Sequence, residues 1–103
     1  MKKLKNLVPK YATHGGNILL DELRARGIKQ SVFCRKYGFS TTIINEIIKG
    51  KRSITAKTAI QLEAALCINA EFWMRIQAMY ELDKERIRQH KHFYFKSKKI
   101  NCA

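Results

Sequence analysis

The sequence has few acidic residues for its length. Only 8 of its 103 residues are Asp or Glu, against 21 Lys and Arg, which gives a formal net charge of +13. A surplus of this size favours a polyanionic partner. The acids are scattered without metal-ligand spacing, and no Ser or Cys is placed with a His as a nucleophile pair would be. We therefore expect no enzymatic activity.

Cysteine is also scarce. Cys34, Cys67 and Cys102 are odd in number and widely spaced, with no C-x-x-C pair, which argues against a disulfide framework and a zinc site. We expect Cys34 and Cys67 to be small buried hydrophobes. His90 and His92 precede Cys102, but the ligand number and spacing are wrong for zinc. We therefore expect no metal and no cofactor.

Long hydrophobic runs are absent. No segment approaches the roughly 20 apolar residues that span a bilayer, and the lysine-containing start has no apolar run of signal-peptide length. We therefore expect a cytosolic protein whose polyanionic partner is nucleic acid and not a membrane surface. Strand signals and internal repeats are absent as well, so the sequence predicts an all-α fold of one small domain.

The stretch from Gln30 to Gly50, QSVFCRKYGFSTTIINEIIKG, predicts two short helices joined at Gly38. The first covers about residues 29–37. Gly38 suits the turn because glycine adopts positive φ without steric cost. Ser40 is a favourable N-cap for the second helix.

The second helix of this stretch is predicted to have two distinct faces. At about 100° per residue, four isoleucines fall on one arc and polar residues on the other: Ile43, Ile44, Ile47 and Ile48 against Thr42, Asn45, Glu46 and Lys49, with Thr41 at the edge. A helix of this kind suits the DNA major groove, and its connection is that of a helix-turn-helix. On this stretch alone a generic helical hairpin fits equally well. The charge and the flanking segments favour the helix-turn-helix.

The flanks predict three further helices, five in all. One covers about residues 17–26 with Asn17 as its cap, one runs from Thr55 to about Cys67, and a longer one starts after Asn69 and reaches about Ile87. A basic loop, Lys51 to Ser53, lies between the helix-turn-helix stretch and the helix that starts at Thr55. Its position beside the second helix of that stretch suits a phosphate contact. The predicted domains are a basic arm (1–13), the helix-turn-helix domain (14–88) and a basic aromatic tail (89–103).

The last predicted helix carries an unusually aromatic apolar stripe. We expect most of it to be core and the remainder to be a dimer contact, because exposed Trp, Tyr and Met are enriched at interfaces. The candidate dimer residues are Trp73, Ile76, Met79 and Tyr80. In the tail, the basic residues flank Phe93, Tyr94 and Phe95, a pattern that suits phosphate binding and base stacking. A partly disordered tail, or one that docks on a protein, fits this pattern equally well.

From about His14 to Asp83 the sequence resembles the HigA-type antitoxins, a branch of the XRE helix-turn-helix family with a lambda-repressor-like fold. The matching segments are HGGNILLDEL, the Gln30–Gly50 unit with its continuation STTIINEIIKGKRSIT, TAKTAIQLEAAL and AEFWMRIQAMYEL. INEIIKGKRSIT followed by EFW and Q-A-x-Y is the specific combination. The resemblance implies a homodimer that represses its own operon at an inverted repeat and neutralises a HigB-type toxin, an mRNA endonuclease.

By position, the resemblance also implies roles for single residues. Thr41, Thr42 and Asn45 match the base-facing positions, and Glu46 is a further candidate because its carboxylate can accept from a cytosine amino group. Gln30 matches a backbone-contacting glutamine, and the other candidates for phosphate contact are Ser40, Lys49, Lys51 and Arg52. No arginine lies on the outward face of this helix, so we expect affinity to depend largely on phosphates.

Two positions depart from the family pattern within the matching region. Gly15 replaces a common proline, which predicts a looser entry to the first helix, and Cys67 replaces a helix-ending glycine, which predicts strain or a different turn. Two alternative functions stay open at this point. One is a stand-alone XRE regulator without a toxin, and the other is an interaction module that binds RNA or the ribosome.

Overall fold

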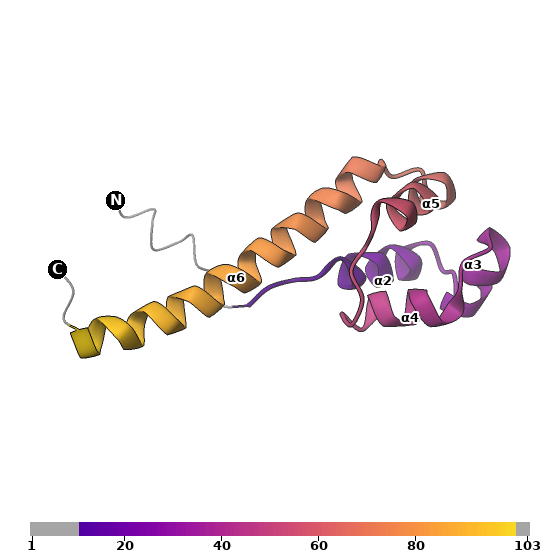
Figure 1. Ribbon diagram of the computed structural model, residues 1–103. Coiled ribbons are helices and arrows are strands. Elements are labelled where there is room, and N and C mark those ends of the chain that lie inside the picture. Colours follow the sequence, from indigo (N-terminus) through magenta and orange to yellow (C-terminus); the bar gives the residue numbers. More distant parts are fainter. Residues whose placement is uncertain (1–10, 101–103) are drawn as a thin grey trace. The chain divides into compact units, whose positions relative to one another are not determined.

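The computed structural model describes residues 11–100, with side chains described as far as Lys91. This range contains five α-helices and no strand, as expected for an all-α, lambda-repressor-like fold (Figure 1): α2 (Gly15–Ala25), α3 (Gln30–Tyr37), α4 (Thr41–Ile48), α5 (Ala56–Leu66) and α6 (Ala70–Ile100). The chain divides into two units, one of residues 13–78 and one that joins residues 11–12 to the chain from Met79 onward.

Two segments of the predicted domains lie wholly or partly outside this description. Residues 1–10 of the predicted basic arm and residues 101–103 of the tail are outside the described residues, and so is Cys102. The side chains of His92, Phe93, Tyr94 and Phe95 are not described either, although α6 includes these residues. The helix does not end near Ile87, as the sequence predicted, but continues to Ile100.

A single hydrophobic core holds the unit of residues 13–78 together. It draws on every helix, and its buried members are Leu19, Leu23, Phe33, Cys34, Ile44, Ile47, Ile54, Ala59, Leu62, Ala65, Leu66 and Trp73. Burying an aliphatic or aromatic side chain of this size stabilises the fold by about 1.5–3 kcal/mol. Cys34 is a buried hydrophobe, as expected, and burial raises the pKa of its thiol.

Helices α2 and α4 lie side by side (Figure 1) and approach each other closely at one glycine. A Cβ atom on Gly16 would lie 2.0 Å from the carbonyl oxygen of Ile47 and 2.7 Å from Cα of Ile48. Only a residue without a side chain fits at this distance. Gly16 therefore allows the backbone of α4 to pack directly against α2.

The N-terminus of α2 differs from the prediction. The helix begins at Gly15, not at Asn17, and the N-cap is His14, whose Nδ1 accepts a hydrogen bond from Gly16 N at 3.1 Å. Gly15 does not loosen this end of the helix, because it is buried and a Cβ atom there would lie 2.6 Å from Cδ1 of Ile54.

The central stretch folds as predicted. Gly38 ends α3 in the left-handed region at φ 73°, and Ser40 caps α4, its Oγ accepting from Ile43 N at 3.3 Å. Ile44 and Ile47 are buried under the helix. These contacts fix the angle between the two helices and turn the polar side of α4 outward.

Helix α5 is capped by Thr55, as predicted, and ends at a strained residue. Thr55 Oγ1 accepts from Thr58 N at 3.3 Å. Cys67 follows the helix with φ 59° and ψ 34°, a left-handed conformation that costs a non-glycine residue about 1–2 kcal/mol. The prediction that Cys67 is buried was wrong, because this residue is exposed. Ile60 of α5 is 60% exposed, although its side chain is large and apolar.

The first turns of α6 are joined to the rest of the bundle by two polar contacts. Glu63 Oε2 accepts from Ala70 N at 3.1 Å, and so satisfies a backbone donor at the helix N-terminus. Gln77 is only 6% exposed, and its Oε1 accepts from the backbone N of Ile54 at 2.8 Å. No helix among the described residues is both long and apolar enough to span a membrane.

Candidate nucleic-acid interface

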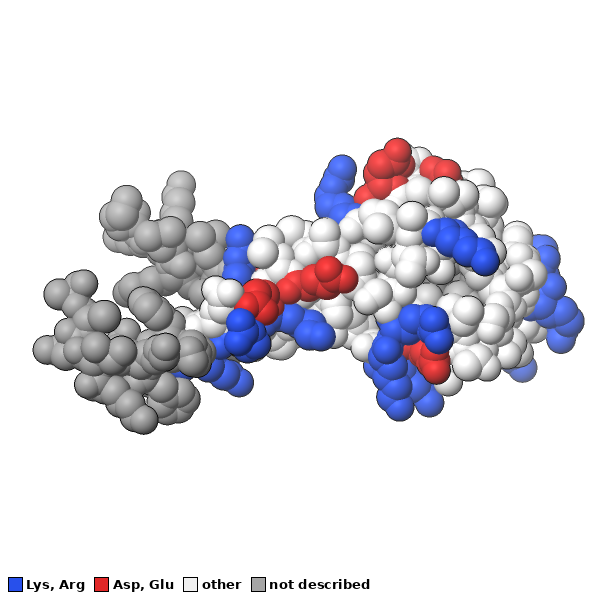
Figure 2. Space-filling model, in the orientation of Figure 1, with Lys and Arg blue, Asp and Glu red and all other residues white. Residues whose placement is uncertain are grey.

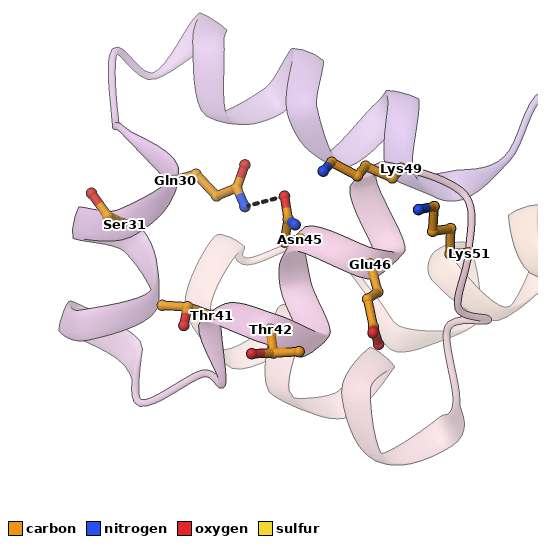
Figure 3. Close-up of a pocket in the computed structure, with 8 residues that line it drawn as sticks. All are labelled: Gln30, Ser31, Thr41, Thr42, Asn45, Glu46, Lys49 and Lys51. Atoms are coloured by element: carbon orange, nitrogen blue, oxygen red, sulfur yellow. Dashed lines mark hydrogen bonds between the residues drawn. The ribbon is translucent and has the colours of Figure 1, made fainter.

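The outward side of α4 and the start of α3 form one polar surface, which we call the recognition face. It is an open depression of about 670 Å³ lined by Gln30, Ser31, Thr41, Thr42, Asn45, Glu46, Lys49 and Lys51 (Figure 3). Seven of these eight residues were candidates from the sequence. Because α4 buries its isoleucines against the core, its polar side chains are presented together and away from the core.

Thr41, Thr42 and Asn45, the residues predicted to face bases, lie together on the outward side of α4. The two threonines are exposed, and Asn45 is half-buried. Asn45 Oδ1 accepts a hydrogen bond from Gln30 Nε2 at 3.4 Å (Figure 3). The structure thus joins a residue predicted to contact the DNA backbone to one predicted to contact a base.

Glu46 and Arg52 form an ion pair, with Arg52 Nε 2.7 Å from Glu46 Oε1. The sequence assigned Glu46 to a base and Arg52 to a phosphate without placing them together. Both side chains are more than a third exposed, so the pair contributes little to stability. The pair instead changes the charge of the candidate interface, because the Glu46 carboxylate neutralises Arg52, one of the positive charges nearest α4.

The remaining candidates for phosphate contact border the recognition face. Lys49 and Lys51 are exposed, and Figure 3 shows them near the C-terminal end of α4, with Glu46 pointing away from them. Ser40 lies at the N-terminus of the helix, where its Oγ accepts from Ile43 N. Its hydroxyl hydrogen can still be donated to a phosphate oxygen. The N-terminus of α4 is also the positive end of the helix dipole, which favours an anion at this position.

Sequence reasoning missed Ser31, which lines the recognition face beside Gln30. The signal was available, since the first residues of the helix before the turn lie next to the recognition helix in this arrangement. The face that Figure 2 shows has more Lys and Arg than acidic side chains, and several Asp and Glu side chains lie directly beside Lys or Arg side chains. Local pairing therefore offsets part of the net charge.

The four candidates for a dimer contact have unequal exposure. Trp73 is fully buried in the core of its own protomer, so it offers no surface to a second chain, and we withdraw it from the proposed contact. Its indole packs among core side chains, and Nε1 has no hydrogen-bond partner. Ile76 and Tyr80 are half-buried, and Met79 is 47% exposed. These three residues stay candidates.

Among the side chains described, no three His, Cys, Asp or Glu residues lie close enough together to hold a metal ion. Among the same described side chains, the pKa of Glu85 is lowered to about 2 by hydrogen bonds from Arg88 and Gln89. This pair lies on α6 at the surface and is not part of the recognition face.

Comparison with known proteins places these features in a family. Residues 19–73 match the Helix-turn-helix family. A curated relative, Virulence-associated protein I of Dichelobacter nodosus, is 35% identical over 79 residues, which are 76% of this chain and 71% of the relative.

Two solved structures extend the similarity to antitoxins. The Pseudomonas aeruginosa antitoxin HigA, solved with the higBA promoter, is 31% identical with a TM-score of 0.72, covering 80% of this chain and 90% of that one. An addiction module antidote protein of the HigA family from Coxiella burnetii is 27% identical with a TM-score of 0.73, covering 87% and 95%. The chain belongs to the XRE-type helix-turn-helix family, and within it to the HigA-type antitoxins.

Proposed function

We propose that this protein binds an operator as a dimer, represses its own operon and neutralises a HigB-type mRNA endonuclease. The observation that carries the DNA-binding part is the recognition face, on which the eight-residue helix α4 presents Thr41, Thr42 and Asn45 beside Lys49 and Lys51. The solved antitoxin in contact with a promoter supports the same role. The protein would act in the cytoplasm, where its operator lies.

The side chains on this helix determine what each would contact. Asn45 would bond to adenine, the methyl groups of Thr41 and Thr42 would meet thymine methyls, and the second carboxylate oxygen of Glu46 would accept from a cytosine amino group. Gln30, Ser40, Lys49, Lys51 and Arg52 would contact phosphates and hold the helix in register. Since none of these base contacts is an arginine on guanine, phosphates would supply most of the affinity.

A single recognition helix touches few bases, so we propose a symmetric dimer on an inverted repeat. The half-sites would lie about one helical turn of DNA apart. Helix α6 would supply the contact through Ile76, Met79 and Tyr80, the last two near the boundary of the two units.

The test is co-expression of the tagged chain with the product of its neighbouring gene, followed by pull-down and a shift assay with the upstream promoter fragment. A stable complex that also shifts the promoter supports the antitoxin-repressor. A shift without a bound neighbour supports a stand-alone regulator. If Thr42→Ala combined with Asn45→Ala leaves nucleic-acid binding unchanged, the recognition face is dispensable and an RNA-binding or ribosome-binding module takes its place.

A further inference from the structure

A second basic surface lies on α6, within the unit that contains residues 11–12 and the chain from Met79 onward. It is an open depression of about 450 Å³, which we call the α6 groove, and it is lined by Ala12, Tyr80, Lys84, Ile87, Arg88 and Lys91. We propose that the α6 groove binds a single-stranded polynucleotide, either RNA or DNA. This activity is additional to the proposed operator binding and involves no residue of the recognition face.

Five residues of the groove lie on one side of α6. From Tyr80 to Lys91 they are separated by steps of four, three, one and three residues. At 100° per residue, all five fall within an arc of about 100°. Lys84 and Lys91 are two turns apart, which is about 10 Å along the helix axis. The α6 groove is therefore an extended stripe, as a chain-like ligand requires.

Apolar side chains form the floor of the groove, and cations form its rim. The half-buried members are Ala12, Tyr80 and Ile87, and the exposed members are Lys84, Arg88 and Lys91. Lys84 Nζ lies 5.0 Å from the centroid of the Tyr80 ring, so an ammonium group and an aromatic ring are presented next to each other. A nucleotide carries the complementary pair of groups, an anionic phosphate and an aromatic base.

Two of the three cations at the rim keep their full charge. Glu85 accepts a hydrogen bond from Arg88 and forms an ion pair with it, which offsets the charge of that guanidinium. Among the described side chains, no ion pair includes Lys84 or Lys91. The sequence contains no Asp or Glu after Glu85. The α6 groove therefore offers a net positive charge to a polyanion.

The apolar floor favours a single strand over a duplex or a membrane. A duplex keeps its bases stacked inside and presents phosphates to a shallow surface, so it would leave Tyr80 and Ile87 uncovered. An anionic membrane binds helices whose apolar side chains insert below the headgroups, whereas the apolar side chains of this groove are half-buried. The unstacked bases of a single strand would cover the floor while their phosphates meet the lysines.

An acidic protein segment is the main competing ligand, because its carboxylates would also meet the lysines. The sequence along α6 favours a polynucleotide. The helix continues to Ile100, and Phe93, Tyr94 and Phe95 follow the groove among further lysines, a composition typical of surfaces on which bases stack. The side chains of these three residues lie outside the described part of the structure.

The test uses the full-length protein and fluorescence anisotropy with three labelled probes. Two are an oligouridylate and an oligothymidylate of about 12 nucleotides, a length within the usual range of single-strand sites, and the third is the operator duplex. We expect the unaltered protein to bind both single strands, with an affinity that falls as salt rises. Lys84→Gln combined with Lys91→Gln should weaken this binding by about tenfold and reduce the salt slope by about 0.7 for each lysine. Operator affinity should be retained.

Tyr80→Leu separates stacking from charge, and it keeps an apolar side chain for the proposed dimer contact. It should lower single-strand affinity by about tenfold without changing the salt slope, because a stacked base releases no counterion. The matched control is Arg35→Gln combined with Lys36→Gln, which removes two exposed cations from α3, where Lys36 also lies over a tyrosine ring. The control should retain single-strand affinity. Circular dichroism melting establishes that each variant is folded.

Three outcomes would overturn the proposal. If the control loses as much single-strand affinity as the lysine variant of the groove, binding depends on net charge and not on a site. If poly-L-glutamate displaces the RNA at an equal concentration of charge and Tyr80→Leu has no effect, the groove suits an acidic protein segment. If neither oligonucleotide binds at physiological salt, the groove has no single-strand function. In each case the operator titration reports separately on the proposed function.

Discussion

Arg52 points its guanidinium at Glu46, with 2.7 Å between Nε and Oε1, so the loop after the recognition helix is held by an acid on that helix. We predict that Glu46→Gln raises affinity for non-operator DNA, because Arg52 becomes available to phosphates, and lowers the preference for the operator. The slope of log K against log salt should steepen by up to about 1 for each protomer. Fluorescence anisotropy titrations with operator and non-operator DNA at several salt concentrations measure the two affinities and the salt slope.

The control for this variant is Glu22→Gln, which removes the ion-pair partner of Arg26 and adds the same charge on α2. Equal changes in the two variants would mean that only net charge matters. An unchanged affinity in Glu46→Gln for both kinds of DNA would contradict a phosphate contact by Arg52.

Lys51→Ala should weaken binding to every DNA sequence by a similar factor. The residue is exposed at the border of the recognition face, so we expect it to neutralise a phosphate, and its loss should reduce the salt slope by about 0.9 for each protomer. Lys36→Ala on α3 is the control, because it removes the same charge from a lysine that does not line the recognition face and lies over the ring of Tyr37. A loss confined to one operator variant would show that Lys51 contacts a base instead.

Gly16→Ala should destabilise the protein by about 1–3 kcal/mol, because the added Cβ would overlap the carbonyl of Ile47 and force α2 and α4 apart. Gly15→Ala is the matched comparison: its Cβ would meet Cδ1 of Ile54, the movable end of a side chain. We expect a smaller loss there. Urea unfolding measures both, and equal losses would argue against a backbone contact as the cause.

Cys67→Gly should stabilise the protein by about 1 kcal/mol. Glycine adopts the left-handed conformation of residue 67 without the steric cost that a side chain adds, and the exposed thiol contributes little packing. Cys67→Ala retains the Cβ and should leave the free energy of unfolding nearly unchanged. If alanine stabilised as much as glycine, the thiol and not the backbone would be responsible.

Met79→Lys should convert the proposed dimer to a monomer. Met79 is 47% exposed between the half-buried Ile76 and Tyr80, and a charge placed in an apolar contact is costly to desolvate. Met74→Lys is the control, because five residues along α6 place Met74 on a face about 140° away. Sedimentation at micromolar concentration measures the state. An unaltered protein that is already monomeric, with and without DNA, would remove the dimer.

The recognition helix was predictable because its pattern is local. Ser40, the inward isoleucines and the outward Thr41, Thr42 and Asn45 all follow from helical periodicity and capping within one turn-helix segment. The turn at Gly38 follows in the same way, since its positive φ is a property of the residue itself.

The features that the sequence did not predict correctly depend on contacts between segments that are distant in the chain. Asn17 is a better N-cap residue than His14, but the close packing of Gly16 on Ile47 draws both glycines into α2 and moves its start. The burial of Trp73 and the exposure of Ile60 depend on how α5 and α6 meet the core, which periodicity does not specify. The Gln30–Asn45 and Glu46–Arg52 pairs join residues 15 and 6 positions apart, so neither follows from helical spacing.

The contact between Gly16 and Ile47 separates what can vary in this protein from what cannot. It holds α4 by its backbone, and Thr41 and Thr42 on the outward side of that helix are exposed, so these two side chains contribute little to the packing. Substitutions at Thr41 or Thr42 should therefore redirect the protein to new operators without loss of folding. The same scaffold can acquire new DNA targets one side chain at a time, provided that residue 16 stays glycine.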